Sequence, residues 1–182
     1  WRMEASGINL GTAWRANTYN DSSWSSGNAL FYNFDGSGTQ PPPIPANTVV
    51  PFTNPKQSTV YFRTTFNYTG ALSGVTFSLS HVIDDGCVVY LNNQEVYRYN
   101  IGTGISVTYS TLASPGISGA PSLQSGITVP LPSLVQGTNY LAVEVHQQTL
   151  TSSDLAMALQ IDALEFRTNY LSIPVVLNEV FT

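Results

Sequence analysis

The sequence VIDDGCVVYLNNQEVYRY, residues Val82–Tyr99, carries the clearest fold signal of the chain. Within it, Cys87–Leu91 and Glu95–Tyr99 are runs of residues that favour β-strands. Asn92 and Asn93 lie between the two runs, and Asn is one of the few residues other than glycine that accept a positive φ. The stretch therefore predicts a two-stranded antiparallel hairpin closed at Asn92-Asn93.

An acidic turn, Asp84-Asp85-Gly86, precedes this hairpin, because Asp tolerates a left-handed backbone and Gly adopts one freely. Ca²⁺ prefers oxygen ligands, so Asp84 and Asp85 are candidate ligands of a structural calcium ion, the one cofactor expected here. In the other interpretation, the two carboxylates accept hydrogen bonds from amides of their own turn. No spacing in the chain matches an EF-hand loop, and both interpretations stay open.

Further segments of the chain predict strands, most of them with one apolar face and one polar face. Leu141, Val143 and Val145, for example, lie on one face of 140–147, with the two-residue period of a strand. The other expected strands are 60–66, 75–80, 105–110, 127–131 and 155–166. About eight short strands and almost no helix predict an all-β fold, an antiparallel β sandwich of jelly-roll type.

The composition limits the possible partners. The chain has 182 residues, which suits one large β domain, and charged residues make up 9% of it, against about 25% in an average soluble protein. The formal net charge is −5 with 6 Lys and Arg, so a basic patch for nucleic acid is not expected. No apolar run is long enough for a transmembrane helix. The chain begins at Trp1 without an initiator Met, which predicts a processed product or an excised segment.

Two residues invite an acid–base interpretation. Glu144 and His146 lie on the same face of one predicted strand, and a carboxylate beside an imidazole is the minimum for proton transfer. The chain has no nucleophile motif and no second paired carboxylate, so we expect a packed or solvent-facing pair and no enzyme. His146 is then expected to hydrogen-bond a loop. It is also a candidate ligand-binding residue, because the loops around Trp14, Trp24, Asp84, Asp85 and His146 are the expected rim of a site. The single cysteine, Cys87, is expected to be a small buried hydrophobe.

Aromatic side chains are the candidates for sugar binding. Trp14 and Trp24 stand ten residues apart in a segment without strand or helix periodicity, and a flat ring packs well on the C–H face of a sugar. In the other interpretation they close the open end of the sandwich. Four tyrosines cluster around the hairpin, namely Tyr90, Tyr97, Tyr99 and Tyr109. They are able to stack on a glycan, and Arg98 is able to bind a charged sugar; cross-strand aromatic pairing is the alternative.

Several motifs together resemble a known module. They are NDSSWSSGNA (20–29), VYFRTTF (60–66), DDGCVVYLNNQEVYRYN (84–100), LAVEVHQ (141–147) and SSDLAMALQI (152–161). In this order they resemble the galactose-binding-like jelly-roll module of large secreted bacterial proteins, over nearly all of 14–166. The resemblance implies a secreted, non-catalytic β sandwich for carbohydrate or cell-surface attachment, often with a structural calcium ion. Members typically have Asn-Gly where this chain has Asn92-Asn93.

The C-terminal segment predicts something separate from the sandwich. Residues 1–168 are expected to form the jelly roll, and 169–182 a strand or linker into a following domain or a neighbouring subunit. VVLNEVF (175–181) is apolar on both faces and resembles the opening strand of a lamin-tail-type domain. The alternative to a glycan-binding module is therefore a structural subunit of an extracellular filament or surface layer, which self-associates through 171–182 by strand addition.

Overall fold

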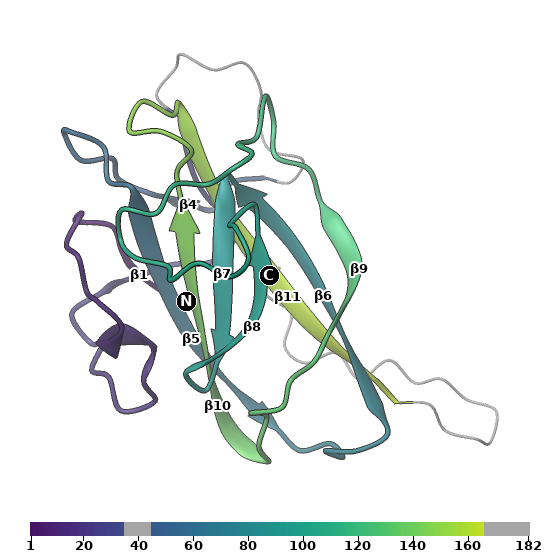
Figure 1. Cartoon of the computed structure of the whole chain (residues 1–182). Coiled ribbons are helices and arrows are strands. Elements are labelled where there is room, and N and C mark those ends of the chain that lie inside the picture. The colour runs from purple at the N-terminus through teal and green to yellow at the C-terminus, as the bar shows by residue number, and fades with distance from the viewer. Residues whose placement is uncertain (35–44, 166–182) are drawn as a thin grey trace.

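The apolar faces of the strands meet between two β-sheets, which lie one in front of the other in Figure 1. This computed structural model describes residues 1–34 and 45–165. Sheet A contains, in spatial order, β2 (Ser25–Ser26), β1 (Arg2–Glu4), β5 (Thr59–Tyr68), β10 (Gly137–His146), β7 (Gly86–Leu91) and β8 (Gln94–Tyr99). Sheet B contains β4 (Thr48–Val49), β3 (Phe31–Phe34), β11 (Asp154–Glu165), β6 (Val75–Asp84) and β9 (Gln124–Val129). The predicted all-β sandwich is confirmed.

The central hairpin forms as the sequence predicts. β7 and β8 pair antiparallel, and Asn92 and Asn93 have φ angles of 48° and 72°. The Asn92 side chain also joins the turn to its surroundings, because Nδ2 donates to the carbonyl oxygen of Ser133 (2.7 Å) and Oδ1 accepts from the backbone N–H of Tyr140 (2.9 Å). Asparagine at this position therefore fixes the hairpin tip to β10 as well as closing the turn.

The acidic turn carries the chain from one sheet to the other. β6 ends at Asp84 in sheet B and β7 begins at Gly86 in sheet A. The expected left-handed backbone at Gly86 is wrong, because its φ is not positive. Glycine is required there by close packing instead: a Cβ would lie 2.9 Å from the carbonyl oxygen of Tyr99 and 2.9 Å from Cβ of Ala113.

The strand expected at 105–110 is absent, and the chain there runs without strand structure. Ile101 and Ala113 are buried on the outer face of sheet A, and Val107 and Tyr109 pack against the same cluster. Residues 101–113 therefore cover the sheet instead of pairing with a strand, and we call them the covering segment. The prediction misread a covering segment as a strand because both bury alternate apolar side chains.

A second hydrophobic core lies between this covering segment, the N-terminal segment and the outer face of sheet A. Trp14, in the 3-10 helix η1 (Ala13–Arg15), packs on Tyr61 of β5 and Tyr90 of β7, with ring centroids 4.7 and 5.9 Å apart. Sheet A is thus buried on both faces at this end. Among the described residues, no helix is long and apolar enough to cross a membrane. The predicted boundary after 168 and the tail 169–182 lie outside the described residues.

Candidate functional site

Asp85 organises one end of the sandwich. Its Oδ1 accepts a hydrogen bond from the backbone N–H of Ile117 (2.8 Å), and its Oδ2 accepts from the N–H of Gln148 (2.7 Å) and the hydroxyl of Ser152 (3.0 Å). The side chain is buried, and the bonds join two loops that are far apart in sequence. Because a buried carboxylate is stable only with such partners, Asp85 is a fixed anchor for the loops at this end.

His146, at the end of β10, anchors the covering segment in the same region. Its Nδ1 lies 2.8 Å from the carbonyl oxygen of Thr111, and since a carbonyl only accepts, Nδ1 carries a proton. The expected hydrogen bond between His146 and a loop is therefore present. Nε2 faces Oε2 of Glu144 at 3.5 Å, and the Tyr90 hydroxyl donates to Oε1 of Glu144 (2.5 Å). The pair is buried beneath the covering segment, as a packed interpretation predicts.

A cleft of about 510 Å³ opens between the loops at this end. Four stretches of chain that are remote in sequence form its walls. The lining residues are Ser6, Gly7, Thr53, Asn54, Pro55, Lys56, Ser58, Tyr109, Ser110, Leu112 and Leu150. Hydroxyl and amide groups are joined there by one aromatic ring and three aliphatic side chains, a mixture typical of small-molecule sites. We call this the loop-end cleft.

The walls of the loop-end cleft are held by buried hydrogen bonds. The carbonyl oxygen of Tyr109 accepts from the hydroxyls of Ser58 and Thr59, each at 2.6 Å. Buried Gln57 accepts from the N–H of Thr53 (2.9 Å) and donates to the carbonyl oxygen of Pro51 (2.7 Å). These bonds fix the backbone on both sides of the Tyr109 ring. The cleft is therefore formed before a ligand binds, which lowers the entropic cost of binding.

Two leucines are exposed at the cleft. Leu112 is 44% exposed and Leu150 is 49% exposed. The residues on either side of Leu112 are tied to β10 and its end, since Thr111 bonds His146 and the N–H of Ala113 donates to the carbonyl oxygen of Gln147 (3.0 Å). The backbone around Leu112 is therefore fixed, and the side chain gives the cleft an apolar wall in contact with water.

The structure does not expose the two tryptophans that the sequence offered as sugar platforms. Trp14 is 0% exposed and Trp24 is 6% exposed, so neither presents a ring face for stacking, and this is a correction. They do not close the end of the sandwich either, because both belong to the core on the outer face of sheet A. Trp24 packs edge-on against Tyr19, with ring centroids 5.7 Å apart.

Tyr97 and Arg98 also have partners within the protein. The Tyr97 hydroxyl lies 3.0 Å from Nε2 of buried His81, and its ring packs against the main core. Arg98 binds both carboxylate oxygens of Glu95, at 2.6 and 2.7 Å. Neither residue lines the loop-end cleft. Sequence reasoning left ligand binding and cross-strand pairing open, and it could not show that Tyr97 has a partner in the other sheet and Arg98 a partner in its own strand.

The acidic turn is a poor match for calcium at Asp85. N–H and O–H donors point at both of its carboxylate oxygens, where a cation would need the lone pairs. At Asp84, Oδ2 is buried and has no hydrogen-bond partner. Burial, with the charges of Asp154 and Asp85 adding, raises the pKa of Asp84 to about 9. In 1–34 and 45–165 there is no group of three His, Cys, Asp or Glu side chains placed to hold a metal ion, and calcium at Asp84 stays a prediction.

The turn also differs from both sequence interpretations in one respect. Asp85 accepts hydrogen bonds from other loops, not from its own turn. Sequence reasoning found the anchors Asp85 and His146 but missed the cleft above them, since Leu112 and Leu150 carry no motif. Tyr109 was recognised only as one of several tyrosines near the hairpin.

Comparison with known proteins gives the fold. No protein-family model and no curated protein matches the sequence. Among solved structures, the chain is similar to Bacteroides uniformis β-glucuronidase 2 covalently bound to cyclophellitol-6-carboxylate aziridine (13% identity, 90% of this chain, 18% of that chain, TM-score 0.52). It is similar to a calcium-binding mutant of the same enzyme at 13% identity over 90% of this chain and 18% of that chain, with a TM-score of 0.50. A PA14 sugar-binding domain from an RTX adhesin matches at 15% identity, over 71% of this chain and 56% of that one, with a TM-score of 0.29.

These similarities concern architecture. The chain spans less than a fifth of the length of the two enzyme chains, so it corresponds to a part of them. At this identity the likeness shows a shared β-sandwich fold, and function is argued from the sites.

Proposed function

We propose that this chain is a non-catalytic, extracellular carbohydrate-binding module and that a glycan binds in the loop-end cleft. The observation that carries the proposal is the fixed position of Tyr109, whose backbone is held by Ser58 and Thr59 at the wall of a preformed cleft. An aromatic ring with hydroxyl and amide groups around it offers both stacking and hydrogen bonding to a sugar. The low content of charged residues, 9%, suits an uncharged ligand.

The composition of the cleft walls supports a non-catalytic role. Hydrolysis of a glycosidic bond normally uses two carboxyl groups on opposite sides of the bond. The described lining residues include no Asp or Glu, and Lys56 is the only charged side chain among them. Glu144 and His146 are buried under the covering segment and are not among the residues that line the cleft.

A glycan array tests the proposal with paired variants. Tyr109→Ala removes the ring, whereas Tyr109→Phe keeps it and loses only the hydroxyl. Wild-type protein and Tyr109→Phe are expected to bind the same glycans, and Tyr109→Ala to lose those that bind in the loop-end cleft. Arrays probed with and without calcium separate the glycan proposal from the calcium prediction. If the wild-type protein binds no glycan on the array, with or without calcium, the proposal is wrong.

A further inference from the structure

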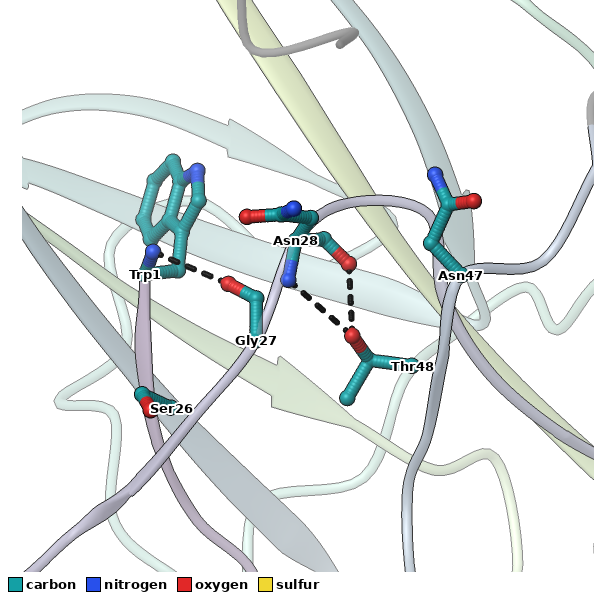
Figure 2. Close-up of a pocket in the computed structure, with 6 residues that line it drawn as sticks. All are labelled: Trp1, Ser26, Gly27, Asn28, Asn47 and Thr48. Atoms are coloured by element: carbon teal, nitrogen blue, oxygen red, sulfur yellow. Dashed lines mark hydrogen bonds between the residues drawn. The ribbon is translucent and has the colours of Figure 1, made fainter.

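A second hollow lies at the lateral edge of the sandwich, away from the loop end. It is about 570 Å³ in volume and is lined by Trp1, Ser26, Gly27, Asn28, Asn47 and Thr48. These residues come from the start of the chain and the segments around β2 and β4, which are edge strands of sheets A and B. Figure 2 shows the indole of Trp1 on one side of this edge groove, the side chain of Asn47 on the other, and Asn28 between them.

Trp1 is the one tryptophan of three that is not buried. Part of its ring packs against the main core, and its backbone nitrogen donates to the carbonyl oxygen of Gly27 at 3.1 Å. The indole is thus held in place by packing and by the backbone while it lines the edge groove. A fixed, partly exposed indole is the strongest stacking surface that a side chain provides.

The floor and far wall of the edge groove are also fixed. The Thr48 hydroxyl accepts from the N–H of Asn28 (3.0 Å) and donates to its carbonyl oxygen (2.8 Å). Gly27 makes this close approach possible, because a Cβ there would lie 2.4 Å from Oγ1 of Thr48. Asn47 donates its backbone N–H to the carbonyl oxygen of Leu30 (2.9 Å). The side chain of Asn28 remains exposed beside the ring.

The chemistry of the edge groove fits one class of ligand. None of the described lining side chains carries a charge, and the amino group of Trp1 already donates to the carbonyl oxygen of Gly27, so the edge groove offers an anionic sugar no charged side chain to replace its hydration. An asparagine amide offers both donor and acceptor groups, which match the neighbouring hydroxyls of a sugar ring, and the indole face matches its C–H groups. We propose that the edge groove is a second, independent binding site for neutral oligosaccharides, with Trp1 as the stacking platform.

Tryptophan fluorescence tests this inference directly, because Trp14 and Trp24 are buried and Trp1 is open to a ligand. The probes are cellohexaose, xylohexaose and mannohexaose as neutral sugars and hexagalacturonate as the anionic control. At least one neutral probe is expected to give a saturable change in emission that Trp1→Ala abolishes. Asn28→Ala, an exposed substitution, is expected to weaken this binding roughly three- to tenfold through the lost hydrogen bonds.

Tyr109→Ala separates this site from the loop-end cleft. Binding in the edge groove is expected to survive Tyr109→Ala unchanged, even if the glycan proposal for the loop-end cleft fails. The inference is overturned if no neutral probe gives a saturable change, if the change persists in Trp1→Ala, or if hexagalacturonate binds as tightly as the neutral probes. Equal urea midpoints for the wild-type protein and Asn28→Ala confirm that its weaker binding is not a loss of folding.

Discussion

Nε of Arg63 lies 2.8 Å from Oδ2 of Asp21, and the same guanidinium donates to the carbonyl oxygen of Trp14. Arg63 is on β5, and its side chain is 3% exposed. The ion pair fastens the N-terminal segment, with Trp14 and Trp24, onto the outer face of sheet A. A charge placed so deeply is tolerated because both of its partners are polar and well placed.

Loss of this ion pair is expected to destabilise the protein strongly. Arg63→Met removes the buried partner of the Trp14 carbonyl and leaves Asp21 with its longer contact to Arg2 (3.4 Å); it is expected to lower the free energy of unfolding by about 3 kcal/mol. The matched control is Arg98→Met, which breaks the pair with Glu95 near the surface and is expected to cost less than about 1 kcal/mol. Urea unfolding of both variants gives the comparison. Equal losses would show that Arg63 does not hold the segment in place.

Trp24 is expected to act on stability and not on binding. Trp24→Ala removes a buried ring and is expected to lower the free energy of unfolding by about 3–5 kcal/mol. Trp24→Phe keeps most of the apolar contact and is expected to cost clearly less. Glycan binding of Trp24→Phe should equal that of the wild-type protein. A Trp24→Phe variant that is as stable as the wild type but fails to bind would restore Trp24 as a ligand residue.

Asp84 is expected to make the protein less stable as the pH rises. Burial raises its pKa to about 9 from an ordinary value of 3.8, so the folded chain keeps this proton over a range in which the unfolded chain releases it. Its contribution to stability is complete below about pH 4 and is lost as the pH rises toward 9. Asp84→Asn, which stays uncharged, is expected to be more stable than wild type at pH 8, with the difference shrinking toward pH 4.

Urea unfolding at several pH values checks the slope, and a parallel series with added calcium tests the metal prediction. A higher midpoint with calcium in the wild-type protein, absent from Asp84→Asn, would show that Asp84 binds the ion. In that case Asp84→Asn would also lose its advantage at pH 8 when calcium is present. If the free energy of unfolding changes with pH in the same way in both proteins without calcium, the proton on Asp84 does not cause that change.

His81 is expected to make the protein less stable as the pH falls. Burial lowers its pKa to about 4 from 6.5, and its ring packs on Tyr99 with centroids 4.7 Å apart. The unfolded chain therefore binds a proton first, so stability is complete above about pH 6.5 and is lost as the pH falls toward 4. His81→Gln should remove this loss, which unfolding curves at pH 4.5 and 7 will show. A difference between the two proteins that is the same at both pH values would contradict the account.

The sandwich was predictable from the sequence because neighbouring residues are enough to identify most of its strands and the hairpin turn. Alternation in 140–147 and the Asn92-Asn93 turn depend only on neighbouring residues, and both are as predicted. The segment after β8 is different, since Ile101 and Val107 contact residues of sheet A that are distant in sequence. The same limit applies to the sites: Asp85 and His146 were visible as polar residues at strand ends, but their loop partners were not. Whether a side chain is exposed depends on contacts with remote segments, and no local pattern encodes these contacts. This applies to Trp1, Tyr109 and Leu150.

Amide chemical shifts of ¹⁵N-labelled protein, titrated with glycans from the array, report binding at the loop-end cleft residue by residue. Saturable shifts are expected at Ser110, Leu112 and Leu150, the cleft walls, in both the wild-type protein and Trp1→Ala. The same titration of Tyr109→Ala should leave these amides unmoved. Saturable shifts confined to other surfaces, or cleft shifts that persist without the Tyr109 ring, would contradict the account.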